Sequence, residues 1–322
     1  MPRLPHSWLL LPACALLSAC TIGFGEDEED DGFAQGKAEV LVDEEYSNDY
    51  AVDAAGDQIA RAGIHPGGVR PLSIRDLDDD GDFEVLTDTS VLASQPRFTP
   101  DGSQIVFEDH DSIDFDTHSR LAVVGVDGSG YRRLDLSTAE NEEVGDIVYV
   151  DDTSVIYERS SIDLDYRYWT IPLDGSAPPQ EAAVVPGDRP ASATLDPSGT
   201  QILWEYFDSE ASPGVTHVFV GPVDSAEGVE IAEHGYSATW SPDGSRIAYL
   251  ADTGETEDDG LPLSAVYLVA ADGSGEPARV PGLDCCLEGP LTWLPDDRIV
   301  VSNASYVVGD HRLYTLDASG VG

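Results

Sequence analysis

The chain has 322 residues, of which 62 are Asp or Glu and only 16 are Lys or Arg, so its formal net charge at pH 7 is −46. Such a negative field repels nucleic acid and anionic membrane surfaces, and we expect neither as a direct partner. It favours cations and basic protein patches, although adaptation to a salty habitat or simple solubility explains the same composition.

The first 20 residues have the features of a targeting segment. Arg3 supplies a positive end, and residues 8–17 form an apolar run that is too short to cross a bilayer. Residues 17–20 (Leu-Ser-Ala-Cys) resemble the lipobox of bacterial lipoproteins, which implies that Cys20 is lipidated and becomes the mature N-terminus. Acylation would anchor the protein stably, and Thr21 after the cysteine favours the outer membrane by the same resemblance. An ordinary secretory signal or a chance cysteine are the alternatives.

An acidic run follows the targeting segment. Residues 25–32 carry like charges without apolar periodicity, which predicts a disordered, self-repelling tether over residues 20–37. Its functional interpretation is a spacer between the membrane and a folded domain, and its plain one is a soluble linker.

A strand–turn–strand pattern then recurs along the rest of the chain. In residues 236–252, apolar positions alternate on both sides of a Pro-Asp-Gly-Ser turn, which predicts a β-hairpin. The other copies are residues 50–60, 96–107, 147–157, 193–204 and 291–301. Taken at the proline position, successive copies lie 45 to 53 residues apart. A strand-rich repeat of this length predicts a β-propeller blade of four strands, so six copies predict six blades.

The repeat Ser/Thr-Pro-Asp-Gly-Ser-x-Ile resembles the WD40-like repeat of TolB-type β-propellers, over about residues 38–320. We therefore expect an all-β, six-bladed propeller of four-stranded antiparallel blades, and three regions: a signal peptide (1–19), the tether (20–37) and the propeller (38–322). Periplasmic TolB has an α/β domain before its propeller, and this chain already begins its blades at residue 38, so the role of that protein is not carried over.

Residues 38–42 form a strand-like segment before the first blade, whereas the chain ends where the sixth blade still lacks an outer strand. We expect residues 38–42 to complete the sixth blade and close the ring, because an open propeller leaves two exposed strand edges.

An acidic motif, Asp-x-Asp-x-Asp-Gly-x-x-Glu, occupies residues 76–84, and we place it in the inner hairpin of the first blade. Oxygen atoms at alternate positions converge where Gly permits a sharp bend, and Ca²⁺ takes about six to eight of them. The pattern resembles the calcium hairpins of integrin-type propellers and marks a candidate Ca²⁺ site. The alternative is an acidic version of the Asp-Gly-Ser-Gly turns of other blades. The candidate ligands are Asp76, Asp78, Asp80, Asp82 and Glu84.

The second and third blades share a further repeat, Ser-Ile-Asp-x-Asp, between their second and third strands. Their carboxylates suit a metal or another cationic ligand, although a solvated acidic loop is the plainer interpretation. The candidate residues are Asp114, Asp116, Asp163 and Asp165.

The sixth blade carries the adjacent pair Cys285 and Cys286. Neighbouring Cα atoms lie about 3.8 Å apart, below the usual disulfide span of about 4.4–6.8 Å, so a bridge between them would be strained. An oxidising compartment favours a vicinal disulfide, and two free thiols are the alternative.

The sequence contains no G-x-S-x-G nucleophile elbow and no H-E-x-x-H zinc motif. We therefore expect no catalysis, and predict a monomeric, lipid-anchored module of the cell envelope, on its periplasmic or its surface side, that binds a protein or a glycan. It would touch the membrane only through its anchor and need no cofactor except the candidate Ca²⁺. The alternative is a metal-dependent propeller hydrolase or lactonase that uses the central channel, since the fold alone does not name a function.

Overall fold

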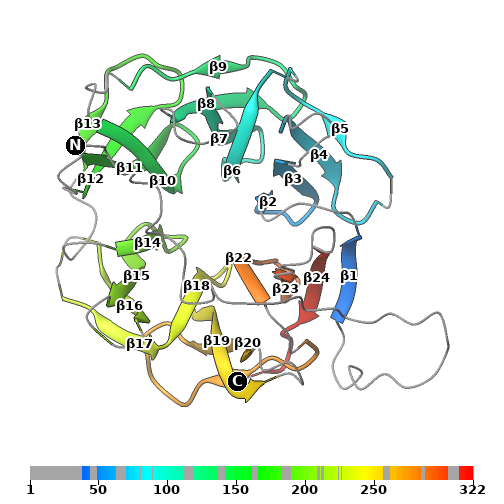
Figure 1. Ribbon diagram of the computed structural model, residues 1–322, viewed down its shortest axis with the longest axis vertical. Helices are drawn as coiled ribbons and strands as arrows, with labels where there is room; N and C mark the ends of the chain where they lie inside the picture. The colour runs from blue at the N-terminus through cyan, green and yellow to red at the C-terminus, as the bar shows by residue number, and fades with distance from the viewer. Residues whose placement is uncertain are drawn as a thin grey trace, which may run out of the picture.

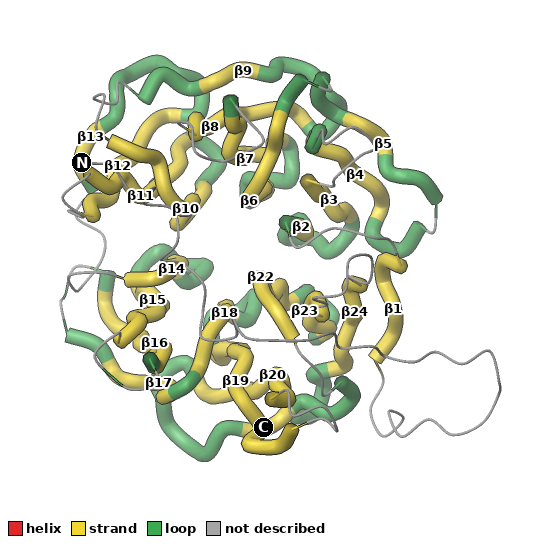
Figure 2. Tube along the Cα trace, viewed as in Figure 1, coloured by secondary structure: helices red, strands yellow, loops and turns green. Residues whose placement is uncertain are grey.

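The computed structural model describes residues 38–43, 49–62, 70–79, 81–88, 90–111, 119–136, 142–161, 166–182, 190–208, 211, 214–223, 225, 227–256, 262–283, 287–303 and 312–321. These residues form six four-stranded antiparallel sheets arranged as blades around a central channel, and they contain no helix (Figure 1 and Figure 2). No segment among them qualifies as a membrane-spanning helix. The predicted six-bladed propeller is confirmed.

In the first three blades, consecutive strands run from the channel outward. Blade 1 consists of β2 (Tyr50–Val52), β3 (Gln58–Ala62), β4 (Leu72–Asp76) and β5 (Glu84–Val85). Blade 2 consists of β6 (Leu92–Phe98), β7 (Gln104–His110), β8 (Ser119–Gly125) and β9 (Arg132–Arg133). Blade 3 consists of β10 (Glu142–Val150), β11 (Ser154–Ser161), β12 (Tyr166–Pro172) and β13 (Gln180–Glu181).

The other three blades follow the same order. Blade 4 consists of β14 (Pro190–Leu195), β15 (Gln201–Asp208), β16 (Val215–Pro222) and β17 (Val229–Glu233). Blade 5 consists of β18 (Gly235–Trp240), β19 (Arg246–Thr256), β20 (Pro262–Ala270) and β21 (Ala278–Arg279). Blade 6 consists of β22 (Leu287–Trp293), β23 (Arg298–Asn303), β24 (Arg312–Asp317) and β1 (Ala38–Asp43).

The first strand of the chain closes the ring as predicted. β1 pairs antiparallel with β24, with Ala38 opposite Leu316 and Asp43 opposite Arg312. The carbonyl of Leu41 also accepts a hydrogen bond of 3.2 Å from Arg75 of blade 1. The two ends of the described chain are therefore held in one sheet, which leaves no strand edge at the junction.

Buried apolar side chains join neighbouring blades, because each blade presents an apolar face to the next. One cluster packs Ile74 and Leu72 of blade 1 against Phe107 of blade 2. Further clusters join blades 2 and 3, blades 4 and 5, blades 5 and 6, and blades 6 and 1. The core of the molecule is thus distributed between blades.

The hairpin turns between the first and second strands carry the predicted turn chemistry. In blade 5, the carboxylate of Asp243 accepts hydrogen bonds from Ser241 Oγ at 2.7 Å and from the Ser245 amide at 2.9 Å. Gly244 has a φ of 71°, a left-handed conformation that glycine adopts without a steric penalty. The proline, aspartate and glycine of the repeat therefore favour the tight turn that closes this hairpin.

Candidate functional site

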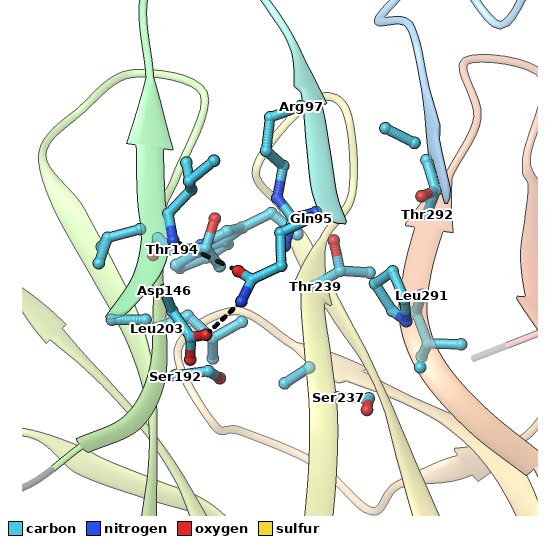
Figure 3. A pocket seen from close by; sticks show the side chains of 18 of the residues that line it. Gln95, Arg97, Asp146, Ser192, Thr194, Leu203, Ser237, Thr239, Leu291 and Thr292 are labelled. Carbon is cyan, nitrogen blue, oxygen red and sulfur yellow. Dashed lines mark hydrogen bonds between the residues drawn. The ribbon is translucent and has the colours of Figure 1, made fainter. Parts of the chain in front are cut away.

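The central channel contains a cavity of about 620 Å³ that receives residues from all six blades (Figure 3). The inner strands β2, β6, β10, β14, β18 and β22 supply most of its wall, and β15 adds Glu205. Its lining is rich in polar side chains, namely Asp49, Gln95, Arg97, Asp146, Ser192, Thr194, Glu205, Ser237, Thr239 and Thr292. The end of the channel that holds Asp49, Asp146 and Glu205 is called the channel mouth below.

Irregularities in the inner strands direct these side chains. The pairing register shifts between Ser94 and Arg97 in β6, and between Tyr236 and Thr239 in β18. Within these shifts, Gln95 has a φ of 48° and Ser237 a φ of 51°. Both residues therefore adopt the left-handed conformation that non-glycine residues seldom adopt. Such β-bulges turn a side chain away from its regular direction, as expected at a site where ligands bind.

Gln95 links blades 2 and 3 across the channel wall. Its Nε2 donates a hydrogen bond of 2.8 Å to Asp146 Oδ1, and its Oε1 accepts one of 3.4 Å from the Ile147 amide (Figure 3). Burial raises the pKa of Asp146, while the hydrogen bond from Gln95 and the charge of Arg97 act in the opposite direction. The carboxyl group of Asp146 is thus fixed in place and ionises less readily than an exposed one.

Arg97 supplies a positive charge to the cavity wall. Burial lowers the pKa of its guanidinium, against the attraction of Asp146, Asp49 and Glu108. Its Nη1 donates a hydrogen bond of 2.9 Å to the carbonyl of Pro96. Burial also raises the pKa of Asp49, whose Oδ2 lies 3.8 Å from Arg70 Nη1.

Three glutamates occupy one equivalent position in the second strands of blades 2, 3 and 4. They are Glu108, Glu158 and Glu205, and each follows an aromatic residue that belongs to the repeat. Burial is the main reason why the pKa of each of these carboxyl groups is raised. The pKa of Glu158 rises to about 8, because the negative charges of Asp146 and Glu108 add to the effect of burial. Each of these carboxyl groups therefore ionises less readily than an exposed glutamate.

Hydrogen bonds hold two of these glutamates. Glu108 Oε2 accepts one of 3.1 Å from Ser94 Oγ and lies 3.2 Å from His110 Nε2. Glu205 Oε1 accepts one of 2.9 Å from the Ala238 amide, within the irregular part of β18. Each glutamate therefore ties a second strand to an inner strand at the channel mouth.

The sequence motif at residues 76–84 lies elsewhere. It connects β4 to β5, at the outer edge of blade 1, and not in the inner hairpin where we expected it, because the inner hairpin of this blade is β2–β3. Asp78 Oδ1 lies 3.5 Å from Arg298 Nη1, and Arg75 Nη1 donates a hydrogen bond of 3.2 Å to the Gly81 carbonyl. Asp76, Asp82 and Glu84 are exposed.

No metal-holding group of three or more His, Cys, Asp or Glu side chains is found among the described residues. Since Asp80 lies outside them, the Ca²⁺ site stays a prediction. The other sequence-based candidates also lie outside the described residues, namely Cys20, Asp114, Asp116, Asp163, Asp165, Cys285 and Cys286.

The channel-mouth residues were not predicted from the sequence, although one signal for them was available. The dipeptides Phe107-Glu108, Tyr157-Glu158 and Trp204-Glu205 fall at the same register of three successive repeats. Charged residues are seldom buried, so a glutamate in the middle of an otherwise apolar strand indicates a functional or a paired residue. Asp49, Gln95 and Asp146 are not all of one residue type, and no repeated dipeptide marks them.

No protein-family model matches the sequence, and no curated protein matches it. The fold is shared by solved structures. A gluconolactonase from Xanthomonas campestris superposes with a TM-score of 0.59 at 12% identity, over 90% of this chain and 91% of that one. An oligogalacturonate lyase in complex with manganese gives 0.54 at 15% identity, over 85% of this chain and 78% of that one. TolB from Acinetobacter baumannii gives 0.53 at 16% identity, over 71% of this chain, and the chain spans 53% of that protein's length.

Likeness at these identities shows the fold alone. It supports the resemblance to TolB-type propellers at the level of architecture. The expectation of no catalysis was wrong as an inference, because enzymes such as the lyase and the gluconolactonase have this fold. The lack of two sequence motifs therefore gives no ground for excluding an enzyme.

Proposed function

We propose that the protein is a β-propeller of the cell envelope that binds a glycan in the mouth of its central channel. The observation that carries this proposal is the cavity of about 620 Å³, with polar side chains from all six blades. Its volume lies within the range of about 300–1,000 Å³ that is usual for ligand sites. The envelope location rests on the predicted signal and lipid anchor at Cys20.

The mixture of polar groups favours a ligand with many hydroxyl groups. Carboxyl groups (Asp49, Asp146) accept hydrogen bonds from hydroxyls, and the guanidinium of Arg97 donates them. The hydroxyls of Thr194 and Thr239 do both. A sugar presents donors and acceptors at every ring position, and it would meet a partner on each side of such a cavity.

A simple cation fits less well. Burial raises the pKa of Asp146, Asp49 and Glu205, so their charged forms are disfavoured, and Arg97 adds a positive charge beside them. Among the described residues no three metal-ligating side chains converge. A metal-dependent hydrolase is therefore not the function we propose.

A second candidate is acid–base catalysis on the bound glycan. It is favoured by Glu158, whose pKa of about 8 lies near the working pH that a general acid needs. A β-carbon at Gly145 would lie 2.8 Å from Glu158 Oε1, so this carboxyl group lies beside the residue that precedes Asp146 of the cavity lining. Release of reducing ends from a bound oligosaccharide, absent in Glu158→Gln, would establish this activity.

The test of binding is an array of envelope glycans, offered to the full-length chain and to a variant with a filled cavity. Thr194→Trp places an indole among the lining residues and should abolish every signal. Thr153→Trp, at an exposed hairpin turn of blade 3, is the matched control and should change none. A blank array for the wild type, or equal binding by Thr194→Trp, would contradict the proposal.

A further inference from the structure

Four aromatic side chains form a continuous row on one face of blade 4. Trp204 stacks on Phe219 with ring centroids 5.5 Å apart, and Phe219 lies 6.2 Å from His217. His217 in turn lies 6.4 Å from Tyr206. The row, called the aromatic ladder below, follows from strand pairing, because Trp204 is opposite Phe219 and Tyr206 is opposite His217.

The ladder lies on the face of blade 4 that is turned away from blade 5. Leu203, Val218 and Val220 pack in the cluster with blade 5, and successive side chains of a strand point to opposite faces. The ladder residues alternate with these three along β15 and β16, so they point away from blade 5. Blade 3 is the neighbour of blade 4 on that side (Figure 1).

Exposure rises along the ladder from the channel to the surface. Trp204 is 7% exposed and lines the channel cavity, whereas the side chain of His217 is 20% exposed and Tyr206 is 40% exposed. Gly228 holds the buried end, since a β-carbon there would lie 2.1 Å from the indole of Trp204. The ladder thus connects the cavity with solvent.

A carboxylate accompanies the exposed end of the ladder. Glu230 Oε1 lies 2.7 Å from His217 Nδ1, which fixes the orientation of the imidazole, and the Glu230 side chain is 46% exposed. Flat rings beside a hydrogen-bonding carboxylate suit a sugar ring, whose faces carry C–H groups and whose edge carries hydroxyls.

We propose that the aromatic ladder binds the continuation of the glycan whose end lies in the channel mouth, so that the ligand is an oligosaccharide. This inference rests on the proposed function and adds the length of the ligand to it. The observation that supports this inference is that the ladder is continuous with the cavity, because Trp204 belongs to both.

The test measures how affinity depends on ligand length. Oligomers of N-acetylglucosamine with one to six sugar units are titrated calorimetrically into the full-length wild type and two variants. Tyr206→Ala shortens the ladder at its exposed end. Phe207→Ala is the matched control, because Phe207 is 41% exposed on the same strand but alternates to the opposite face.

We expect wild-type affinity to rise with length, and Tyr206→Ala to lose about fivefold to tenfold for the longest oligomer while the monosaccharide is unaffected. Phe207→Ala should match the wild type, and thermal melts should show that both variants are folded. Equal length dependence in Tyr206→Ala and the wild type would overturn the ladder while leaving the channel site standing. No binding of any length by the wild type would overturn both. The same three proteins are also titrated with an oligoarginine peptide. If Tyr206→Ala weakens binding of this peptide but not of the oligosaccharides, the ladder binds a basic protein instead.

Discussion

The hairpin turns and the channel mouth are both acidic, yet they have opposite effects on a carboxyl group. In the turns, hydrogen bonds from Ser245 and Ser241 lower the pKa of Asp243 to about 2. At the mouth, burial together with Asp146 and Glu108 raises the pKa of Glu158 to about 8. The two environments differ because turn carboxylates accept several N–H and O–H groups in water, whereas mouth carboxyls lie among like charges with less solvent.

This difference separates two meanings of the net charge of −46. A turn aspartate stabilises the hairpin through its charge, so its role is structural. A mouth carboxyl is held where its charge is unfavourable, which is the usual sign of a site used for binding or chemistry. A count of acidic residues does not distinguish the turn aspartates from the carboxyl groups at the channel mouth.

Opening the ring should have the largest effect, because both regions depend on the closed arrangement of blades. Deletion of residues 38–44 removes β1 and exposes the edge of β24, and we expect the melting temperature to fall by roughly 10 °C or more. Deletion of residues 26–31, in the predicted tether, is the control and should leave the melt unchanged. An unaltered melt after loss of β1 would mean that closure contributes little.

The second-largest effect should be a pH dependence of stability that is caused by the partly buried carboxyl group of Glu158. A pKa raised on folding stabilises the protein below the ordinary value of 4.5, and this contribution is lost as the pH rises through about 8. We expect the free energy of unfolding to fall between these values, and Glu158→Gln to remove much of that fall. Chemical denaturation at a series of pH values measures it. Glu227→Gln, at an exposed site, is the control and should follow the wild type.

A turn variant should show the reverse dependence. Asp196 accepts hydrogen bonds from the Thr200 and Gln201 amides at 2.7 and 2.6 Å. Burial opposes its ionisation, but hydrogen bonds from Ser198, Gln201 and Thr200 prevail and lower its pKa. Asp196→Ala should cost about 1–2 kcal/mol of stability at pH 7. The stabilisation by this carboxylate is present above pH 3.8 and lost as the pH falls below it, so an equal cost at pH 3 would contradict the account.

The smallest effect concerns the acidic turn of blade 1. If it binds Ca²⁺, millimolar calcium should raise the melting temperature of the wild type, and the double variant Asp78→Ala/Asp80→Ala should not respond. The rise should be modest, because Arg298 lies 3.5 Å from Asp78 and competes with a cation. No rise with the wild type would remove calcium from the account.

The architecture could be predicted from the sequence because short contiguous segments determine the turns and strands of each repeat. Proline, aspartate and glycine define the turns of the best copies, alternation defines the flanking strands, and residues 38–42 were recognised as the closing strand from the incomplete sixth blade. Local patterns sufficed because each blade is built from hairpins of neighbouring strands.

The channel mouth was not predictable in the same way. Asp49, Gln95, Asp146 and Glu205 come from four different blades, and only the packing of the blades around the channel brings them together. The left-handed conformations of Gln95 and Ser237 give no local signal, since neither residue is a glycine. The acidic motif at residues 76–84, in contrast, could be identified from the sequence because all of its residues lie in one short segment.

The most direct test of the contrast is a carboxyl titration followed by NMR, with Glu158 and Asp243 assigned by substitution to Gln and Asn. The account predicts a midpoint of about 8 for Glu158 and about 2 for Asp243 in the folded protein. Midpoints near the ordinary values of 4.5 and 3.8 would contradict it, because the two regions would then be electrostatically alike.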